Sequence, residues 1–261
     1  MLLKNKNAVI YGAGGEIGGA VARAFAREGA RVFLAGRTLA TLDAVAQDIA
    51  SSGGAAETAQ VDAFDKEAIE RHLEEVVQKA GSVDISFNAV GIPYSQGDPF
   101  TEMPLEEFTA PLAAAMQTQF LTATAVARHM AKKGSGVILT ITATPARLAN
   151  PNSGSFGVAC AAIEGFCRQL AGEVGSHGIR VVCLRSTGSP DGPKLSEFMR
   201  QLAELEGMSR EAFVARIAQK TVLKRMASLA EVGNMAALVA SDYASAMSGT
   251  VANITCGEVV D

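Results

Sequence analysis

The chain has 261 residues, 48% of them hydrophobic, and its 23 basic and 27 acidic side chains give a net charge of −4 at pH 7. A chain of this length and composition is expected to fold around a sizeable core, since disordered chains are poor in apolar residues. The acidic balance and the lack of a basic stripe argue against nucleic acid and anionic membranes as partners.

The sequence also bears on compartment and metal binding. No apolar run is long enough to predict a membrane span, and Met1–Lys6 lacks the apolar core of a signal peptide. The cysteines stand in apolar segments without the spacing of metal ligands, at Cys160, Cys167, Cys183 and Cys256. They are therefore interpreted as small buried hydrophobes of a cytoplasmic protein that binds no metal.

Short apolar runs alternate with stretches of helical periodicity along the chain. The expected strands are Ala8–Tyr11, Arg31–Ala35, Ala56–Val61, Val83–Phe87, Gly136–Ile141, Ile179–Leu184 and Thr250–Ile254. The expected helices are Ile17–Glu28, Leu39–Ser51, Lys66–Ala80, Pro111–Ala131, Ser155–Gly175 and Leu229–Ser241. Strands that are apolar on both faces and alternate with helices predict an α/β fold with a doubly wound, seven-stranded parallel sheet. No linker divides the chain, so residues 1–261 are expected to form one Rossmann-like domain.

The stretch Lys194–Arg225 interrupts this alternation, with two helical patterns before the seventh strand. In an open α/β sheet, ligands bind beyond the carboxyl ends of the strands. An insertion after the sixth strand is therefore expected to form a small helical lid near residues 194–225. A packing insertion without such a role is the alternative.

A cluster of glycines, Gly12, Gly14, Gly15 and Gly18, follows the first expected strand and precedes a helical pattern. The order of strand, glycine turn and helix is typical of a dinucleotide site. Glycine permits the tight turn, and the free N–H groups at the start of the next helix favour a pyrophosphate.

Several segments match one known family in order along the chain. The glycine turn Tyr11–Gly18 aligns with the motif T-G-x-x-x-G-x-G, and Asp84–Gly91 aligns with a strand that ends in N-N-A-G. Further matches are Asp62, Ser176–Val181, Leu223–Met226 and Ser248–Val251. On these matches the chain resembles a short-chain dehydrogenase/reductase over essentially its whole length. The expected cofactor-binding residues are then Gly12, Gly14, Gly15, Ile17, Gly18, Arg37, Asp62, Asn88, Ala89, Gly91, Ser186 and Gly188.

The catalytic residues of that family are not found at the matching positions. The resemblance implies a serine, a tyrosine proton donor and a lysine, but the alignment places Ala143, Phe156 and Cys160 there. The family's asparagine falls on Ala115 or Met116. Since general acid catalysis is typically worth about 10²–10⁴-fold, the usual tyrosine and lysine mechanism is not expected here.

Other residues are considered as substitutes. Tyr94 follows the fourth strand in a loop that borders the expected crevice, although a plain surface tyrosine is the alternative. Thr142 and Thr144 flank Ala143; alternate residues of a strand point to opposite faces, but this rule loosens at a strand end. Cys160 lacks an obvious base or cation beside it, so a nucleophilic role is disfavoured.

The residues after the second strand bear on the choice of nucleotide. An NAD site usually has a carboxylate there, whereas this chain has Gly36 and Arg37. A guanidinium binds a 2′-phosphate through paired hydrogen bonds, which favours NADP(H) over NAD(H); a solvated arginine is the alternative. Glu16 replaces a family glycine and would repel a pyrophosphate unless its side chain turns outward. The segment Arg185–Ser189 replaces the family's Pro-Gly.

Three functions remain open. The first is an NADP(H)-dependent oxidoreductase with a displaced proton donor, or one that acts on an electron-poor substrate such as an iminium ion. The second is a non-catalytic nucleotide-binding subunit or sensor, and the third is a structural partner that binds no nucleotide. By the resemblance, a homodimer or homotetramer is expected to form through Pro111–Ala131 and Ser155–Gly175, which are rich in small residues.

Overall fold

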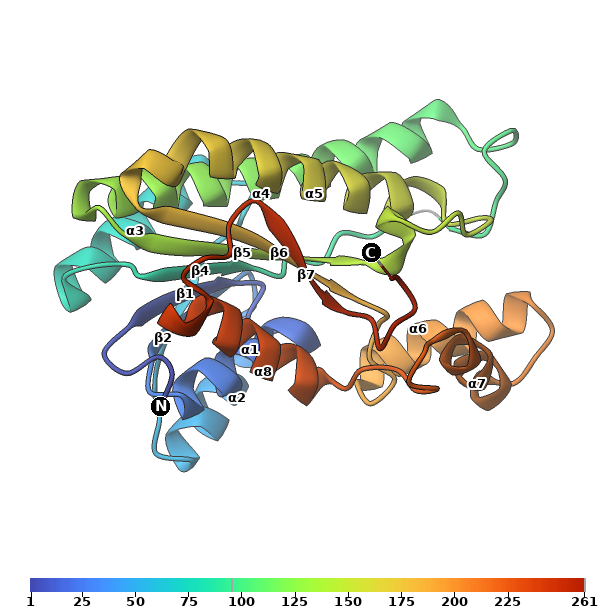
Figure 1. Cartoon of the computed structure of the whole chain (residues 1–261), viewed down its shortest axis with the longest axis horizontal. Coiled ribbons are helices and arrows are strands. Elements are labelled where there is room, and N and C mark those ends of the chain that lie inside the picture. The colour runs from blue at the N-terminus through green and yellow to red at the C-terminus, as the bar shows by residue number, and fades with distance from the viewer. Residues whose placement is uncertain (95, 261) are drawn as a thin grey trace.

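Seven parallel strands form one sheet in the order β3-β2-β1-β4-β5-β6-β7 in the computed structural model, which describes residues 1–94 and 96–260 (Figure 1). The strands are β1 (Asn7–Tyr11), β2 (Arg31–Gly36), β3 (Ala55–Gln60), β4 (Ile85–Asn88), β5 (Gly136–Ala143), β6 (Ile179–Ser186) and β7 (Thr250–Ile254). The chain adds β2 and β3 on one side of β1 and then returns to add β4 on the other side. The sheet therefore has a topological switch point between β1 and β4, and in open α/β sheets ligands bind at the carboxyl ends of the strands at such a point.

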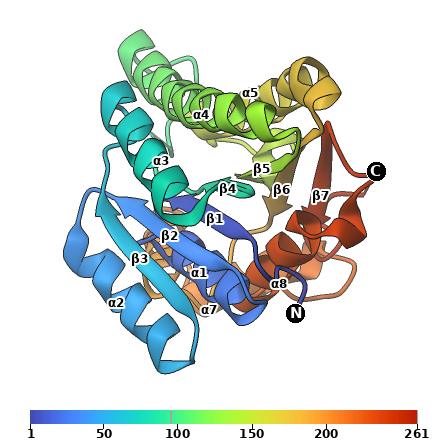
Figure 2. The same ribbon diagram turned by 90° about the vertical axis from the view of Figure 1, so that its left-hand side faces the viewer.

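Helices cover both faces of the sheet, as Figure 2 shows. On one face lie α1 (Glu16–Arg27), α2 (Leu39–Ser51) and α8 (Leu229–Ala240). On the other lie α3 (Lys66–Ala80), α4 (Leu105–Lys133) and α5 (Gly154–Val174). Short 3-10 turns occur at η1 (Thr144–Ala146), η2 (Gly175–His177) and η3 (Asp242–Ala244). Among the described residues, no helix combines the length and the apolar character needed to cross a bilayer.

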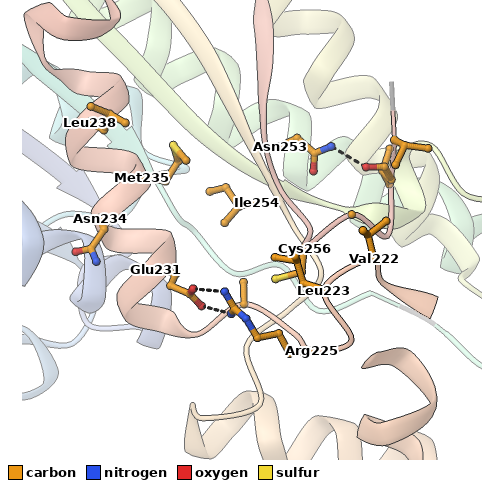
Figure 3. Close-up of a pocket in the computed structure, with 14 residues that line it drawn as sticks. Val222, Leu223, Arg225, Glu231, Asn234, Met235, Leu238, Asn253, Ile254 and Cys256 are labelled. Carbon is orange, nitrogen blue, oxygen red and sulfur yellow. Dashed lines mark hydrogen bonds and ion pairs between the residues drawn. The ribbon is translucent and has the colours of Figure 1, made fainter. Parts of the chain in front are cut away.

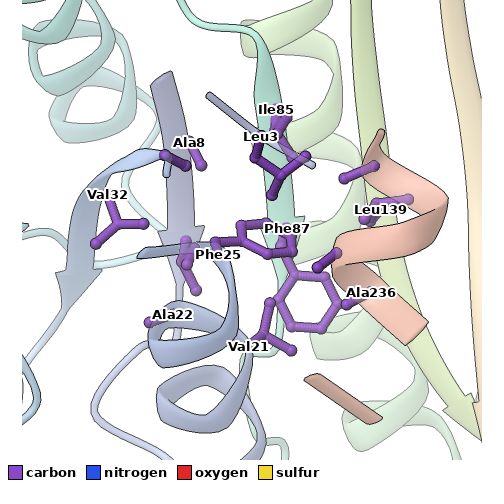
Figure 4. Packing of buried hydrophobic residues seen from close by; sticks show 14 of the residues in the cluster. Leu3, Ala8, Val21, Ala22, Phe25, Val32, Ile85, Phe87, Leu139 and Ala236 are labelled. Atoms are coloured by element: carbon purple, nitrogen blue, oxygen red, sulfur yellow. The ribbon is translucent and has the colours of Figure 1, made fainter. Parts of the chain in front are cut away.

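Successive side chains of a strand point to opposite faces of the sheet, so the buried side chains belong to two separate cores, one on each face. On β1, Ala8 and Ile10 belong to the core under α1, whereas Val9 and Tyr11 belong to the core under α3 and α4. Figure 4 shows the first core, in which Phe25 of α1 packs among residues of the sheet and α8. The two cores hold the sheet rigidly, and its carboxyl edge is therefore a firm base for a binding site.

The helical segment after β6 forms a unit of its own. It consists of α6 (Pro193–Leu205) and α7 (Arg210–Lys220), which lie together at one end of the molecule in Figure 1. Met199 and Ala203 of α6 pack with Phe213 of α7 and with Met226 in a small separate core. The expected pair of helices is confirmed, and its first helix begins just after the carboxyl end of β6.

The predicted fold is confirmed, with two local corrections. The fourth expected helix begins at Leu105 rather than Pro111, which lies inside it. A proline within a helix leaves the carbonyl four residues earlier without its donor, but Glu107 is exposed, so water can bond that group. The other correction is β3, which was expected to be apolar on both faces and is only partly buried, because it is an edge strand paired to β2 alone.

Candidate functional site

The glycine turn lies where the ends of β1, β2 and β4 meet. The Gly12 N–H donates to the Ala35 carbonyl at 2.9 Å, and the Ala89 N–H donates to the Tyr11 carbonyl at 2.9 Å. Gly12 has a φ of +74°, and a Cβ there would lie 2.5 Å from the Ala89 carbonyl oxygen. A side chain is therefore excluded at Gly12, both by its backbone conformation and by the approach of β4.

The first turn of α1 follows directly and leaves backbone donors free. Gly15 is the N-cap, and its extended backbone brings no side-chain acceptor. The N–H groups at the start of a helix have no intrahelical partner, and the helix dipole adds positive charge there. Gly14, Gly15, Ile17 and Gly18 are thus gathered at one helix start, an arrangement that fits the pyrophosphate of a dinucleotide.

Arg37 and Asp62 lie at the ends of neighbouring strands, β2 and β3. Arg37 is exposed, and its carbonyl accepts a hydrogen bond from Gln60 Nε2 at 3.0 Å. Asp62 is exposed as well, and its Oδ1 accepts from the Phe64 N–H at 3.0 Å. Arg37 thus follows β2 directly with an exposed side chain, whereas Asp62 uses one carboxylate oxygen to fix its own turn.

At the end of β4, Asn88 ties the sheet to α4. Its Nδ2 donates to the Thr122 hydroxyl at 2.9 Å and to the Thr118 carbonyl at 3.2 Å, while its Oδ1 accepts from the Val90 N–H at 3.0 Å. The Asn88 amide is therefore used within the protein, where it fixes the strand end that approaches Gly12. Gly91 has open space around the position of a side chain.

The end of β6 differs from the Pro-Gly turn that the resemblance implied. The Gly188 N–H donates to the Ser186 hydroxyl oxygen at 3.3 Å, and Gly188 has a φ of +89°. Ser186 pairs directly with Ala143 across β5 and β6. The register therefore brings a hydroxyl-bearing residue beside the position of the family's serine.

Phe156 and Cys160 stand one helical turn apart in α5, and Cys160 lies beside Ala143 at the end of β5. Cys160 is buried and hydrogen-bonds the backbone of Ala143, one residue before η1. Burial raises the pKa of the Cys160 thiol to about 12, so the thiol is neutral at physiological pH, and the disfavoured nucleophilic role gains no support. Ala115, one of the two positions matched to the family's asparagine, is also buried in α4.

Tyr94 lies against this group. Its ring centroid is 5.0 Å from that of Phe156, with the two rings tilted by 54°. Burial, with a smaller contribution from the charge of Cys160, raises the pKa of the Tyr94 phenol above its ordinary value. The loop after β4 thus brings a neutral hydroxyl-bearing ring beside the phenylalanine that stands at the family's proton-donor position.

A buried ion pair was missed by the sequence analysis. Arg185 of β6 and Glu164 of α5 are 2% and 3% exposed, and Arg185 donates from Nε and Nη2 to the two carboxylate oxygens at 2.8 and 2.7 Å. Thr142 donates to Glu164 Oε1 at 3.0 Å, so its hydroxyl is used beneath the crevice. The signal in the sequence was a pair of opposite charges, each within an otherwise apolar segment.

The remaining candidate hydroxyl, Thr144, lies buried in η1. It hydrogen-bonds the carboxylate of Glu258, whose pKa is raised chiefly by burial. Both threonines that flank Ala143 are therefore engaged with carboxylates, Thr142 with the buried Glu164 and Thr144 with the half-buried Glu258. This geometry favours Tyr94 over Thr142 and Thr144 as the substitute hydroxyl.

A separate groove of about 760 Å³ lies between α8, β7 and the C-terminal segment (Figure 3). One side carries the ion pair between Arg225 and Glu231, with N–O distances of 2.7 and 2.8 Å. Apolar side chains of Val222, Leu223 and Leu238 line it as well. None of the predicted site residues, all of which are described, lines this groove, so it is distinct from the crevice at the switch point.

The fold and the glycine turn define a Rossmann-like protein with a dinucleotide-type crevice. A family model described as enoyl-(acyl carrier protein) reductase matches residues 12–258, and the chain therefore belongs to this family of short-chain dehydrogenases/reductases. It is 28% identical over 257 residues to the 7alpha-hydroxysteroid dehydrogenase of Escherichia coli (strain K12), covering 98% of this chain and 95% of that relative.

Two solved structures illustrate the likeness in fold. The NAD+-bound xylitol dehydrogenase superposes with a TM-score of 0.89 at 21% identity, over 97% of this chain and 99% of that one. The gluconate 5-dehydrogenase from Burkholderia cenocepacia J2315, solved with NADP and tartrate, superposes with a TM-score of 0.86 at 23% identity, over 98% and 96%. Neighbours of the same fold thus hold either NAD or NADP, and relatives of this chain are oxidoreductases.

The buried ion pair yields a stability prediction. Replacing Arg185 by Met leaves the Glu164 carboxylate buried without its bidentate partner, so the free energy of unfolding should fall by about 3–5 kcal/mol. Arg23→Met is the matched control, because Arg23 makes a similar contact to Asp48 at 2.7 Å in an exposed place, and should cost at most about 1 kcal/mol. Urea unfolding measures both variants; equal losses would contradict the assignment.

Proposed function

We propose that this chain is an NADP(H)-binding oxidoreductase with a non-standard active site. It transfers hydride to or from a small, apolar carbonyl, enone or imine-type substrate, and it acts as a single domain. The oxidoreductase character of its relatives supports this function, as does the glycine turn, whose helix start fits a pyrophosphate. The described cysteines are free, which supports a reducing compartment such as the cytoplasm.

The contact between Tyr94 and Phe156 carries the proposal. Carbonyl reduction needs a hydride at carbon and a proton at oxygen, and Phe156 has no proton to give. A nicotinamide, when bound, would supply the hydride. The hydroxyl of Tyr94, whose ring centroid lies 5.0 Å from that of Phe156, donates the proton to the substrate oxygen, so that an alcohol forms.

The surroundings of Tyr94 make its hydroxyl a weak proton donor. Burial raises the pKa of Tyr94, so the hydroxyl keeps its proton through neutral pH. The family's lysine, which would ease the loss of that proton, is replaced by the neutral Cys160. Substrates that need little protonation, such as enones and above all iminium ions, are therefore expected to react faster than simple ketones.

A non-catalytic nucleotide-binding subunit or sensor is the second candidate, favoured by the combined presence of Ala143, Phe156 and Cys160. Calorimetric titration with NADPH and NADH, followed by assays with ketones, enones and cyclic imines, separates the two functions. Micromolar NADPH binding with turnover of any of these substrates supports the oxidoreductase. Tight binding without turnover supports the sensor, and failure to bind either nucleotide would contradict both.

The preference for NADP(H) rests on Arg37. Because Arg37→Glu replaces a phosphate-binding cation by an anion, it should weaken NADPH binding by about 100-fold or more and NADH binding by less than about threefold. Calorimetry measures both affinities. Lys66→Glu, which reverses an exposed charge at the start of α3, serves as control. Equal losses for both nucleotides would rule out the 2′-phosphate contact.

The role of Tyr94 is tested by removing its hydroxyl alone. Tyr94→Phe keeps the ring contact with Phe156 and should reduce kcat for a ketone or aldehyde by about 100-fold. The rate with a preformed iminium substrate should change by less than about threefold, since that substrate accepts hydride without an acid. Steady-state kinetics with both substrates provide the measurement. Unchanged carbonyl reduction would exclude Tyr94 as the proton donor.

We also propose that the chain forms a homodimer or homotetramer. Phe120 of α4 is 55% exposed and lies 6.3 Å, centroid to centroid, from the ring of Phe166 on α5. Val158 of α5 is exposed as well, so the outer surface of α4 and α5 carries exposed apolar side chains. A tetramer needs a second self-complementary surface, and the apolar groove beside α8 is suited to that.

Introducing a charge on the first of these surfaces tests the assembly. Phe120→Glu should shift the protein toward monomers, because a carboxylate at the centre of an apolar interface would be buried without a partner. Leu39→Glu, an exposed position on α2 across the sheet, should leave the mass unchanged. Light scattering coupled to size-exclusion chromatography reports the mass. A monomeric parent protein would refute the proposed assembly.

A further inference from the structure

Glu16 joins two parts of the chain that are far apart in sequence. It is the first residue of α1, directly after the glycine turn, and its carboxylate reaches the first turn of α6. Oε1 accepts from the Lys194 N–H at 2.6 Å, and Oε2 accepts from the Leu195 N–H at 3.0 Å. One side chain thus bonds two successive backbone donors, 178 and 179 residues away.

The start of α6 has no cap of its own that could replace this contact. Its N-cap is Gly192, which has no side-chain acceptor, and Pro193 has no N–H. The donors of Lys194 and Leu195 are the next in the helix, and Glu16 bonds both. The positive end of the α6 dipole adds to the attraction of the carboxylate. Glu16 therefore serves as the N-terminal cap of a helix to which it does not belong.

The fit around the carboxylate is close. A Cβ on Gly192 would lie 2.5 Å from Glu16 Oε2, so a larger residue at Gly192 would displace the carboxylate. The Glu16 carboxylate is directed to the start of α6, and repulsion of a pyrophosphate was expected only if the side chain did not turn away from it. Its charge is balanced by the helix start of α6 as well as by that of α1 itself.

Further hydrogen bonds hold α6 and α7 together. Arg210 of α7 donates from Nε to the Ser196 hydroxyl at 2.6 Å and from Nη2 to the Pro190 carbonyl at 2.9 Å. Asp191 accepts from the Leu229 N–H at the start of α8, at 3.1 and 3.2 Å. Arg210 thus links α7 to α6 and to the segment before it. Glu16 links the start of α6 to α1, and Asp191 links the segment before α6 to α8.

We propose that Glu16 is a positioning residue that holds the lid, α6 and α7, against the glycine turn. The contact holds the lid closed, and a dinucleotide leaves the crevice when the contact opens. The second part rests on the proposed function, whereas the first concerns the protein alone. No residue of the chemical step is involved, since Glu16 acts through the placement of α6.

Hydrogen exchange measured by mass spectrometry tests the contact without any ligand. In Glu16→Ala, the amides of Lys194 and Leu195 lose their acceptor and should exchange about tenfold faster or more. Glu28→Ala is the matched control: Glu28 lies at the other end of α1, and its Oε2 accepts from the Leu2 N–H at 3.0 Å. It should leave exchange over residues 193–205 unchanged. Unchanged exchange in Glu16→Ala, or an equal increase in the control, would overturn the proposal.

Dissociation of NADPH tests the functional part. Glu16→Gln and Glu16→Ala carry the same charge, but glutamine keeps an oxygen that accepts from α6. NADPH should therefore leave Glu16→Ala about tenfold faster than Glu16→Gln, as followed by stopped-flow fluorescence. Equal rates would overturn the link between lid and nucleotide. If the parent protein binds no NADPH, the proposed function fails, and the exchange experiment still decides whether Glu16 holds the lid.

Discussion

The approach of β4 to the end of β1 at Gly12 is the constraint on which the site depends. Because a Cβ at Gly12 would meet the Ala89 carbonyl oxygen at 2.5 Å, the turn can form only with glycine there. The glycine turn also sets the direction of α1, so that the free N–H groups of this helix lie at the switch point. It also fixes the start of α1, from which Glu16 reaches α6. The dinucleotide-type crevice and the attachment of the lid therefore follow from one packing contact.

A second constraint lies beneath the crevice, where a charge pair is buried between α5 and β6. Glu164 stands one helical turn after Cys160, and Arg185 stands one residue before Ser186, so the pair is close to the positions matched to the family's catalytic residues. A carboxylate buried there alone would strongly disturb the field of the crevice. The bidentate guanidinium of Arg185 and the hydroxyl of Thr142 compensate the Glu164 carboxylate.

Much of the fold was predictable because the signals are local. The glycine turn, the alternation of strands and helices, and the pair of helices after β6 each require only a short stretch of sequence. Pro111 misled the assignment of α4, since tolerance of a proline depends on whether the carbonyl it leaves free is exposed. The assignment of Ala143, Phe156 and Cys160 to the family's catalytic positions, which stays a prediction, followed from an aligned register. The contacts of Tyr94, Glu16 and Glu164 did not, because each joins elements whose relative placement is set by tertiary packing.

The chemistry open to this crevice follows from what a hydride acceptor requires. A ketone accepts hydride only as a proton reaches its oxygen, so its reduction depends on the acid available. A phenol whose pKa is raised by burial parts with its proton reluctantly. An iminium carbon carries the positive charge that protonation would otherwise provide, and the π faces of Tyr94 and Phe156 favour a cation. Under the proposed function, with Ala143, Phe156 and Cys160 in place of a serine, a tyrosine and a lysine, the substrate rather than the protein supplies the positive charge that hydride transfer requires.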